Sequence, residues 1–462
     1  MTDSSRQTTP TSRLGKTRRA SRPTVAVVGA GAAGVSAAFW LRKQGADVTL
    51  FERADSVGGR ASTVWRHGFG FDIGAGALPS TNSHVLRLLR EVGFDREVTN
   101  RGAVIGVLHR GTVQRIARRR PQTIAGFGAL SLRSKASLWR LGFDLARMYS
   151  AINYEDMSTA APYDNRTVRE YCDVHFNTEV RENLIAPLTR ALLLVEPERT
   201  SVVDLFAAMK SLLVADHLLT NPNGVAAFLQ RAVEGIDVRC NTSILHVTES
   251  DGSVDVVVDG ATDEPTRFDG CVVALPARNT LEVLPHLDER RRTYLKDLEY
   301  STCIVVNLGI SRAPDENASM VLIPRHDDTG LAAVGLGHNL APGRVPPGGG
   351  ILTAYWMTKW SQDHWSCEDD ELVSLTSATI ERLFPGWVTD IEAAHVTRWD
   401  PAVVASRPGT FRDLVGFSDQ ADPQSRVVLA GDYMAQTSVN ASVAAGELAA
   451  TRLARVLTSN YL

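Results

Sequence analysis

Residues 24–34 read Thr-Val-Ala-Val-Val-Gly-Ala-Gly-Ala-Ala-Gly, and this pattern is the strongest indication of the fold in the sequence. The β-branched run Thr24–Val28 is typical of a buried parallel strand. The three glycines that follow have separate uses. Gly29 allows a tight turn, Gly31 lets backbone approach a pyrophosphate, and Gly34 lets a helix pack closely on the strand. The stretch therefore predicts a strand, a glycine turn and the start of a helix.

A second strand and an acidic residue complete this unit. Ala32–Lys43 has helical periodicity, and Asp47–Phe51 again reads as a strand with Glu52 at its end. A carboxylate there accepts hydrogen bonds from both ribose hydroxyls and repels a 2′-phosphate. The helix N-terminus offers N–H groups to phosphates. We predict a dinucleotide site that disfavours NADP, while the fingerprint leaves FAD and NAD open.

Composition narrows the class of protein. The chain has 462 residues, 44% of them hydrophobic and 22% charged, and a net charge of -3, so nothing indicates nucleic-acid binding. Its 5 cysteines lie at no metal-ligand spacing, which favours reduced thiols in a cytoplasmic protein without a metal site. No apolar run approaches a membrane span. We expect residues 1–22 to be a disordered basic tail, with an organelle transit peptide as the alternative.

The order of elements predicts how the chain divides. The end of the chain repeats the opening pattern, with the strand Val427–Leu429, a glycine turn and an Ala-rich helix near 443–456. We therefore predict an α/β fold, in which a discontinuous Rossmann-like domain is interrupted by an α+β substrate domain inserted in two pieces. The nucleotide domain comprises residues 23–100, 221–285 and 395–462, and the substrate domain comprises 101–220 and 286–394.

Local patterns predict individual elements. Residues 131–152 read as helical, with basic residues on one face and Leu, Trp and Phe on the other. Another helix begins near Asn165 as its N-cap, and a third covers Val202–Leu219. Val238–Val247 reads as one strand. A second sheet is expected from residues 300–310, 320–323 and 351–357.

A second glycine motif favours FAD over NAD as the cofactor. In Asp55-Ser-Val-Gly58-Gly59-Arg60 the paired glycines remove side chains beside a ligand, and Arg60 brings a fixed cation to a phosphate. With this stretch the sequence resembles the flavin-containing amine oxidase superfamily, and its interior is most like the protoporphyrinogen oxidase and phytoene-desaturase-like branch. The resemblance implies non-covalent FAD, because no cysteine lies near the C-terminal motif.

The resemblance also implies which residues contact FAD. Residues 70–76 would lie under the flavin ring, 428–432 at the ribityl chain and pyrophosphate, and the helix from 438 would point its N-terminus at the pyrimidine edge. The implied contact residues are Gly29, Gly31, Ala33, Gly34, Glu52, Arg53, Gly59, Arg60, Gly74, Ala75, Gly76, Ala77, Ile244, Gly431, Asp432 and Val439.

Three departures from the family pattern bear on the reaction. The lysine that amine oxidases link to the flavin through water aligns with Ile304, and an aromatic cage residue aligns with Ser438. The arginine-bearing hairpin of the protoporphyrinogen oxidases reads Ile105-Gly-Val107 here. These departures argue against simple amine oxidation and against porphyrinogen oxidation as the reaction of this chain.

Tyr355 and Trp399 are the candidate substrate residues. Strand alternation sends Tyr355 and Trp356 to opposite faces, and which face borders the pocket stays open, as does core packing of Trp399. The cluster Arg115, Arg118, Arg119 and Arg120 fits either an anionic substrate group or a solvated charge run. His67 and His84 are expected at the surface.

The sequence thus predicts an FAD-dependent oxidoreductase. It would take a hydride from a small organic substrate to flavin N5, form a C=C or C=N bond, and be reoxidised by oxygen, in specialised biosynthesis. A flavin-dependent isomerase or mutase and a non-catalytic binding protein are the alternatives. No catalytic base is named, and the oligomeric state stays open.

Overall fold

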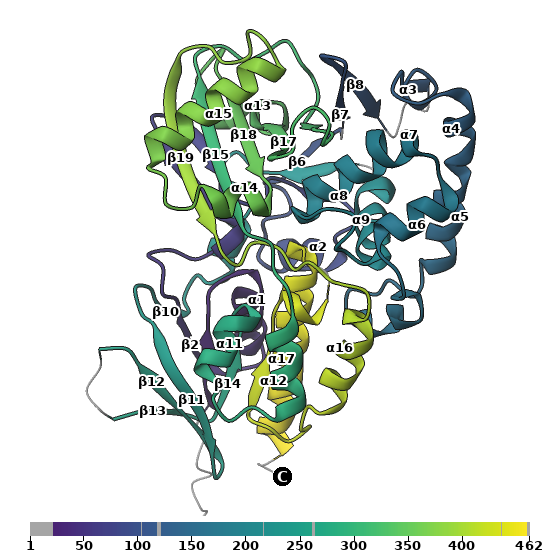
Figure 1. The fold of residues 1–462 in the computed structure, drawn as a ribbon. Coiled ribbons are helices and arrows are strands. Elements are labelled where there is room, and N and C mark those ends of the chain that lie inside the picture. Colours follow the sequence, from purple (N-terminus) through teal and green to yellow (C-terminus); the bar gives the residue numbers. More distant parts are fainter. Residues whose placement is uncertain are drawn as a thin grey trace, which may run out of the picture.

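The structure, a computed structural model, describes residues 22–102, 104–117, 122–215, 217–260, 264–435 and 437–459. Figure 1 shows a parallel sheet with its helices in the lower part, a larger sheet in the upper part and a group of helices to one side. The predicted fold class is confirmed, because the parallel sheet is assembled from three separate stretches of chain.

The parallel sheet has five strands in the order β10-β2-β1-β14-β20. Its central strand β1 pairs with β2 on one side and β14 on the other, in parallel. The strand from the end of the chain, β20, then extends the sheet beyond β14. The strands are β1 Thr24–Val28, β2 Asp47–Phe51, β10 Asp237–Arg239, β14 Gly270–Val273 and β20 Val427–Leu429.

Both faces of this sheet are covered, which explains its continuous apolar strands. Val25 and Val27 pack toward α1 and α17, while Ala26 and Val28 pack toward a three-stranded antiparallel sheet. A Cβ at Gly446 of α17 would lie 2.1 Å from the Ala33 carbonyl oxygen, so these two helices need glycine at their contact. The covering elements are α1 Ala32–Lys43, α2 Ser83–Glu91, α10 Ala227–Ala232, α17 Val439–Ser459, β11 Ile244–Ser250, β12 Ser253–Val258 and β13 Thr266–Phe268.

The larger sheet has seven strands in the order β19-β15-β18-β17-β16-β7-β8. One face packs against α14 Thr358–Asp363 and α15 Asp369–Leu383, with Trp356 buried in that layer. The other face looks toward the helices and the flavin motifs. The strands are β7 Val104–His109, β8 Thr112–Ala117, β15 Cys303–Ile310, β16 Met320–Leu322, β17 Leu331–Leu336, β18 Gly350–Trp356 and β19 Ile391–Trp399.

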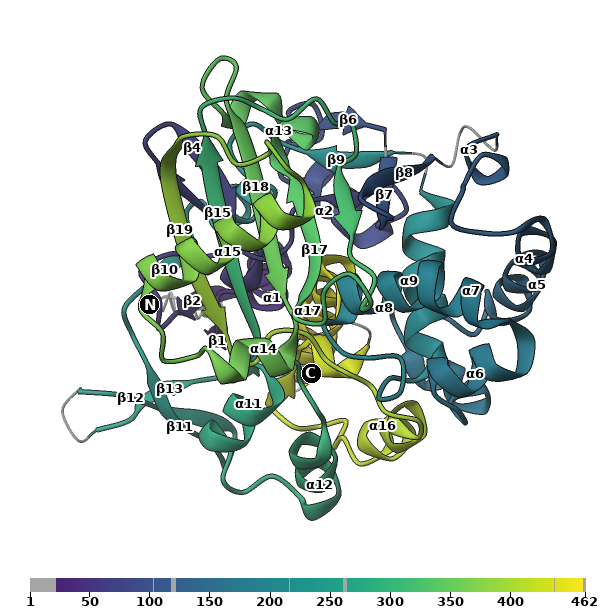
Figure 2. The ribbon, with the colours of Figure 1, turned by 45° about the horizontal axis from the view of Figure 1, so that its top comes forward.

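The remaining elements are mostly helical. In Figures 1 and 2 the helices between residues 122 and 214 form one side of the molecule. They are α3 Gln122–Ala125, α4 Leu132–Ser137, α5 Trp139–Met148, α6 Val168–His175, α7 Thr178–Val180, α8 Ala186–Leu193 and α9 Val202–Val214. The others are α11 Ala277–Val283, α12 Glu289–Asp297, α13 Gly337–Leu340 and α16 Thr410–Asp419, with short strands β3 Thr63–Arg66, β4 Phe69–Asp72, β5 Leu78–Pro79, β6 Thr99–Arg101 and β9 Leu218–Thr220.

Three local predictions were wrong. The N-cap of α6 is Thr167, not Asn165, because Thr167 forms a reciprocal capping box with Glu170. The helix predicted to reach Leu219 ends at Val214, and β9 follows it and pairs with β5 and β6. The single strand predicted over 238–247 is two strands, β10 and β11, in different sheets.

The predicted boundary at residue 395 falls inside β19. This strand pairs along its length with β15 of the seven-stranded sheet, so residues 395–399 pack with the larger sheet. The rest of the predicted domain division stays a prediction. Across the described ranges, no helix combines the length and apolarity needed to cross a membrane.

Candidate functional site

The turn after β1 forms a cradle without side chains. Gly29 has φ +94°, which an L side chain rarely adopts, and a Cβ at Gly34 would lie 1.7 Å from the Gly29 carbonyl oxygen. A Cβ at Gly31 would meet no protein atom within 4 Å. Because α1 begins here without a side-chain cap or an acid in its first turn, its N-terminus suits an anion.

A second glycine turn lies against the first. The Gly58 N–H donates to the Ala30 carbonyl at 2.9 Å, and Gly31 and Gly58 form a parallel bridge. Gly58 and Gly59 have φ of +122° and +54°. A Cβ at Gly59 would lie 3.3 Å from the Gly31 Cα. Two segments predicted to contact the pyrophosphate are thus adjacent.

Glu52 is positioned at the end of β2 by backbone donors. Its Oε2 accepts from the Ala30 N–H at 2.7 Å, and its Oε1 accepts from the Ala54 N–H at 2.9 Å. The Thr242 N–H donates to the Glu52 carbonyl at 2.8 Å, which brings the start of β11, Ile244, to this end of the site. Arg53 is exposed beside it.

The half-buried Arg60 forms an ion pair with the buried Asp432, which comes from a distant part of the sequence. Its Nη1 lies 2.7 Å from Asp432 Oδ2 and donates to the Ala402 carbonyl at 2.7 Å. The Tyr300 hydroxyl donates to Asp432 Oδ1 at 2.9 Å and accepts from the Ala277 N–H at 3.2 Å. Burial would lower the pKa of Arg60, but the Asp432 carboxylate outweighs this and raises it. Arg60 therefore stays cationic, and Tyr300 is a member of the site that the sequence did not reveal.

The loop expected under the flavin ring, residues 74–77, is preceded by a second buried ion pair. A Cβ at Gly74 would lie 2.1 Å from the Arg60 carbonyl oxygen, and the Ala75 N–H donates to that oxygen at 3.1 Å. Asp72, just before the loop, pairs with the buried Arg344, which also donates to the Asn221 carbonyl at 2.8 Å. Burial raises the pKa of Asp72, and Arg344 opposes this. Gly76 and Ala77 are half-buried like the rest of the loop.

The two candidate substrate residues meet at this same loop. The Trp399 indole Nε1 donates to the Ile73 carbonyl at 2.6 Å, and the Tyr355 hydroxyl donates to the Gly74 carbonyl at 3.5 Å. Both side chains are half-buried, and both pack against one apolar cluster that contains Cys303, Val305 and Met357. Trp356 faces the opposite layer, where its Nε1 donates to Thr376 Oγ1 at 3.1 Å. The face that carries Tyr355 is therefore the one beside the flavin motifs.

The position aligned with the family lysine faces away from this loop. Ile304 is buried in the layer under α15, whereas its neighbours Cys303 and Val305 pack with Tyr355 and Trp399. Alternation along β15 explains the difference. The alignment with Ile304 stays a prediction, and neither of the neighbours that do face the site, Cys303 and Val305, supplies an amine.

The N-terminus of α17 is tied to α2. Ser438 Oγ accepts from the Ala441 N–H at 3.1 Å, so the residue that replaces the family aromatic caps the helix. Asn440 Oδ1 accepts from the N–H groups of His84 and Val85 at 3.0 and 3.3 Å. Its Nδ2 is buried and has no protein partner in the structure. Val439 is half-buried at the first turn.

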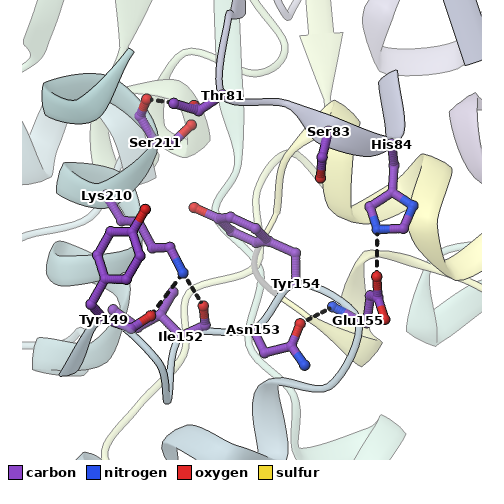
Figure 3. A pocket seen from close by; sticks show the side chains of 10 residues that line it. All are labelled: Thr81, Ser83, His84, Tyr149, Ile152, Asn153, Tyr154, Glu155, Lys210 and Ser211. Carbon is purple, nitrogen blue, oxygen red and sulfur yellow. Dashed lines mark hydrogen bonds and ion pairs between the residues drawn. The ribbon is translucent and has the colours of Figure 1, made fainter. Parts of the chain in front are cut away.

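His84 lines a separate pocket of about 200 Å³ between α2, the loop after α5 and α9 (Figure 3). Its Nε2 lies 3.0 Å from Glu155 Oε1 and its Nδ1 lies 3.1 Å from Glu447 Oε2, so the predicted surface position was wrong. Lys210 Nζ donates to the carbonyls of Tyr149 and Ile152 at 2.8 and 2.5 Å. His67 is exposed, as expected.

The basic cluster contributes one described residue. Arg115 Nε and Nη2 donate to the two carboxylate oxygens of the buried Glu316 at 2.8 and 2.9 Å. A guanidinium held in this way serves to fix β8 to the loop before β16. Arg118, Arg119 and Arg120 lie outside the described residues. Among the residues that are described, no three His, Cys, Asp or Glu side chains are placed to hold a metal ion.

These features fit FAD. The glycine cradle leaves open space at Gly31 beside the N-terminus of α1, and Asn440 carries an unpaired buried donor at a second helix N-terminus. The sequence profile of the flavin containing amine oxidoreductases matches residues 32–454. The chain belongs to this family. The predicted family and the predicted flavin cofactor are confirmed.

Individual relatives match this chain over different shares of its length. Over 208 residues the chain is 31% identical to AofH, named as a flavin-containing monoamine oxidase of Mycobacterium tuberculosis, and the match covers 43% of each protein. The chain thus spans less than half the length of these relatives. It is 23% identical to the coproporphyrinogen III oxidase of Staphylococcus aureus over 411 residues, 78% of this chain and 83% of that protein.

A solved structure shows the same fold over almost the whole chain. The cyclohexylamine oxidase of Brevibacterium oxydans superposes with a TM-score of 0.75 at 18% identity and covers 95% of this family member and 100% of that chain. The likeness extends to both the parallel sheet and the larger sheet. The predicted resemblance to amine oxidases and protoporphyrinogen oxidases is confirmed.

Proposed function

We propose that this family member is an oxidase that takes a hydride from a C–H bond of a small, largely apolar substrate. The product would carry a new C=C or C=N bond, oxygen would restore the oxidised cofactor, and the reaction would serve specialised biosynthesis. The contact residues named from the sequence, from Gly29 to Val439, are proposed as the FAD-binding set. Tyr355 and Trp399 are proposed to border the substrate.

One observation carries the proposal. Next to the Gly74 loop, Val305 of β15 pairs with Tyr355 of β18, Cys303 pairs with Trp399 of β19, and Met357 packs in the same cluster. These are apolar or aromatic groups without a formal charge. An ammonium substrate would lose its hydration here without gaining a carboxylate partner from these strands, which is costly. An uncharged substrate avoids this cost.

Among the described residues, the two titratable side chains of this cluster, Cys303 and Tyr355, are not proton acceptors at neutral pH. Burial raises the pKa of the Cys303 thiol to about 12, and burial also raises the pKa of the Tyr355 hydroxyl. Both groups therefore stay protonated and cannot act as general bases. The substrate must itself release its proton readily when the hydride leaves, as an amine N–H or an activated C–H does.

Bound FAD supplies a two-electron acceptor that takes hydride at N5. The residues of the chain would hold the FAD and orient the substrate beside it. The first turn of α1 and Arg60 would hold the pyrophosphate, and Glu52 would hold the ribose. Trp399 and Tyr355, through their bonds to the Ile73 and Gly74 carbonyls, would fix the loop under the ring and exclude water from it.

Anaerobic reduction of the bound flavin tests the proposal. Uncharged substrates with activated C–H bonds should bleach the visible flavin absorbance, and admitting oxygen should restore it with one product formed per flavin cycle. Bleaching by simple primary amines but not by uncharged compounds would overturn the proposal. Conversion of substrate without oxygen uptake, with flavin kept reduced, would assign the isomerase alternative instead.

A further inference from the structure

Helices α4 and α5 carry an apolar stripe on their outer face. Leu132 is 83% exposed, Trp139 67% and Phe143 54%, and Ala136 and Ala146 are exposed between and beyond them. The spacing of four, three, four and three residues places all five side chains on one side of the two nearly continuous helices. We call these five residues the α4–α5 stripe.

The opposite face of α5 is an ordinary core face. Leu141, Asp144 and Met148 are buried against the rest of the helical group, and the Tyr171 hydroxyl donates to Asp144 at 2.7 Å. The helix therefore has two apolar faces, and among the residues that the structure describes only the inner one is buried against other elements. In both Figure 1 and Figure 2, α4 and α5 lie at the outer edge of the molecule, away from the parallel sheet.

A basic row runs beside the stripe. Arg133, Arg140 and Arg147 are spaced by seven residues, which keeps them on one flank of the helices. Asp144 is the sole acid between residues 122 and 152, and it is buried with Arg140 Nε at 2.6 Å. No exposed carboxylate between residues 122 and 152 compensates the positive charge of the three arginines. The exposed surface thus combines projecting apolar groups with positive charge.

We propose that the α4–α5 stripe docks on an anionic membrane surface. A helix with Leu, Trp and Phe on one side and arginines on its flank is suited to lie in the lipid interface, with its apolar groups among the acyl chains and its guanidinium groups at anionic headgroups. Such docking is peripheral and requires no spanning helix.

The charges argue against two other occupants. A second copy packed on the same stripe would bring two arginine rows side by side, which is repulsive. Residues 1–21 of the chain carry Asp3 as their one acid against Arg6, Arg13, Lys16, Arg18 and Arg19, so they do not complement the row either. A surface of negative headgroups complements both the stripe and the row.

Vesicle co-sedimentation of the FAD-loaded full chain tests the proposal. We expect binding to phosphatidylcholine vesicles that contain phosphatidylglycerol, weaker binding to phosphatidylcholine alone, and loss of binding in high salt. The double variant Trp139→Ser/Phe143→Ser should reduce the partition coefficient by about tenfold or more. The double variant Arg133→Gln/Arg147→Gln should reduce it by roughly 30-fold.

Matched controls separate docking from general damage. Leu448→Ser/Val415→Ser removes two apolar groups exposed by 43% and 39% on other helices, and Arg278→Gln/Arg267→Gln removes two arginines exposed by 71% and 72%. Both controls should bind vesicles as the unaltered chain does, and all four should keep their flavin. If the unaltered chain stays in the supernatant with anionic vesicles, or if the controls lose binding equally, the proposal is wrong. A dimer in sedimentation equilibrium that Trp139→Ser abolishes would assign the stripe to a second copy and also overturn it.

Discussion

At the scale of single residues, two glycines of the same turn have different steric neighbours. A Cβ at Gly31 meets open space, whereas a Cβ at Gly34 overlaps the Gly29 carbonyl oxygen. We predict that Gly31→Ala folds with an unchanged melting temperature as apoprotein but weakens FAD binding by more than about tenfold, because its methyl occupies ligand space. Fluorescence titration with FAD measures the affinity.

Gly34→Ala provides the contrast. Its methyl collides with backbone inside the protein, so we expect a loss of on the order of 2 kcal/mol in the unfolding free energy of the apoprotein. Urea unfolding measures this. Equal loss of stability in the two variants would show that Gly31 is a structural glycine and not part of the cofactor cradle.

Tyr300 is predicted to act on FAD through Asp432 and Arg60. Tyr300→Phe removes the 2.9 Å hydrogen bond to Asp432 and should raise the dissociation constant of FAD by roughly threefold to tenfold. Tyr163→Phe, which removes a weak 3.4 Å bond at the surface, is the control and should bind FAD normally. An unaltered affinity in Tyr300→Phe would separate Tyr300 from the cofactor site.

Residues of this kind mark the limit of prediction from sequence. The glycine turns, Glu52 and Arg60 were predictable because each motif is short and its spacing follows from the backbone geometry of a strand, turn and helix. Tyr300, Arg344 and Asn440 were not, since each reaches its partner across a large sequence separation that only the folded chain closes. No local pattern distinguishes them from other polar residues.

At the scale of elements, the Asp72–Arg344 pair joins β4 to the turn after α13 beneath the flavin loop. Arg344→Leu leaves a buried carboxylate unpaired, and we expect it to cost about 3–5 kcal/mol in the free energy of unfolding. The double variant Asp72→Asn/Arg344→Leu should recover part of this loss, because no charge is then stranded. Urea unfolding of the three proteins gives the coupling free energy between Asp72 and Arg344. Strictly additive losses of stability would contradict the expected coupling.

The buried Asp204 of α9 makes the stability of the helical group depend on pH. Burial raises its pKa to about 7, and its Oδ2 accepts from the Ser406 N–H at 3.2 Å. Because the folded state holds this proton more tightly than the unfolded state, the contribution is complete below the ordinary pKa of 3.8 and is lost as the pH rises through about 7.

Asp204→Asn should remove this dependence. Between about pH 5 and about pH 8, the unaltered chain should lose on the order of 2 kcal/mol more unfolding free energy than the variant. Urea unfolding at the two pH values measures both proteins. Parallel pH profiles would mean that Asp204 is ionised in the folded chain throughout this range.

Element boundaries show where sequence patterns stop being informative. The first strand, helix and second strand have the predicted bounds, because their apolar periodicity is uninterrupted. The helix predicted to run on to Leu219 stops at Val214 because β9 is recruited by β5 and β6, which come from far earlier in the chain. Tertiary pairing overrides local propensity at such points.

At the scale of the whole molecule, the site exists only because three stretches of chain meet. β1 and β2 come from the beginning, β14 from the middle and β20 with α17 from the end. The larger sheet then brings Tyr355 and Trp399 to the same loop. The order of elements along the sequence predicted that these stretches form one domain, whereas the direction of each β15 and β18 side chain needed the strand register.

The position of the cofactor in a crystal structure of the FAD complex decides whether the two glycine turns and the Gly74 loop form its site. We predict one FAD per chain, with its pyrophosphate between Gly31 and the first turn of α1, and its ring over the Gly74–Ala77 loop beside Tyr355 and Trp399. A flavin whose ring lies against the opposite face of the larger sheet, or a pyrophosphate held away from Gly31 and Arg60, would contradict it.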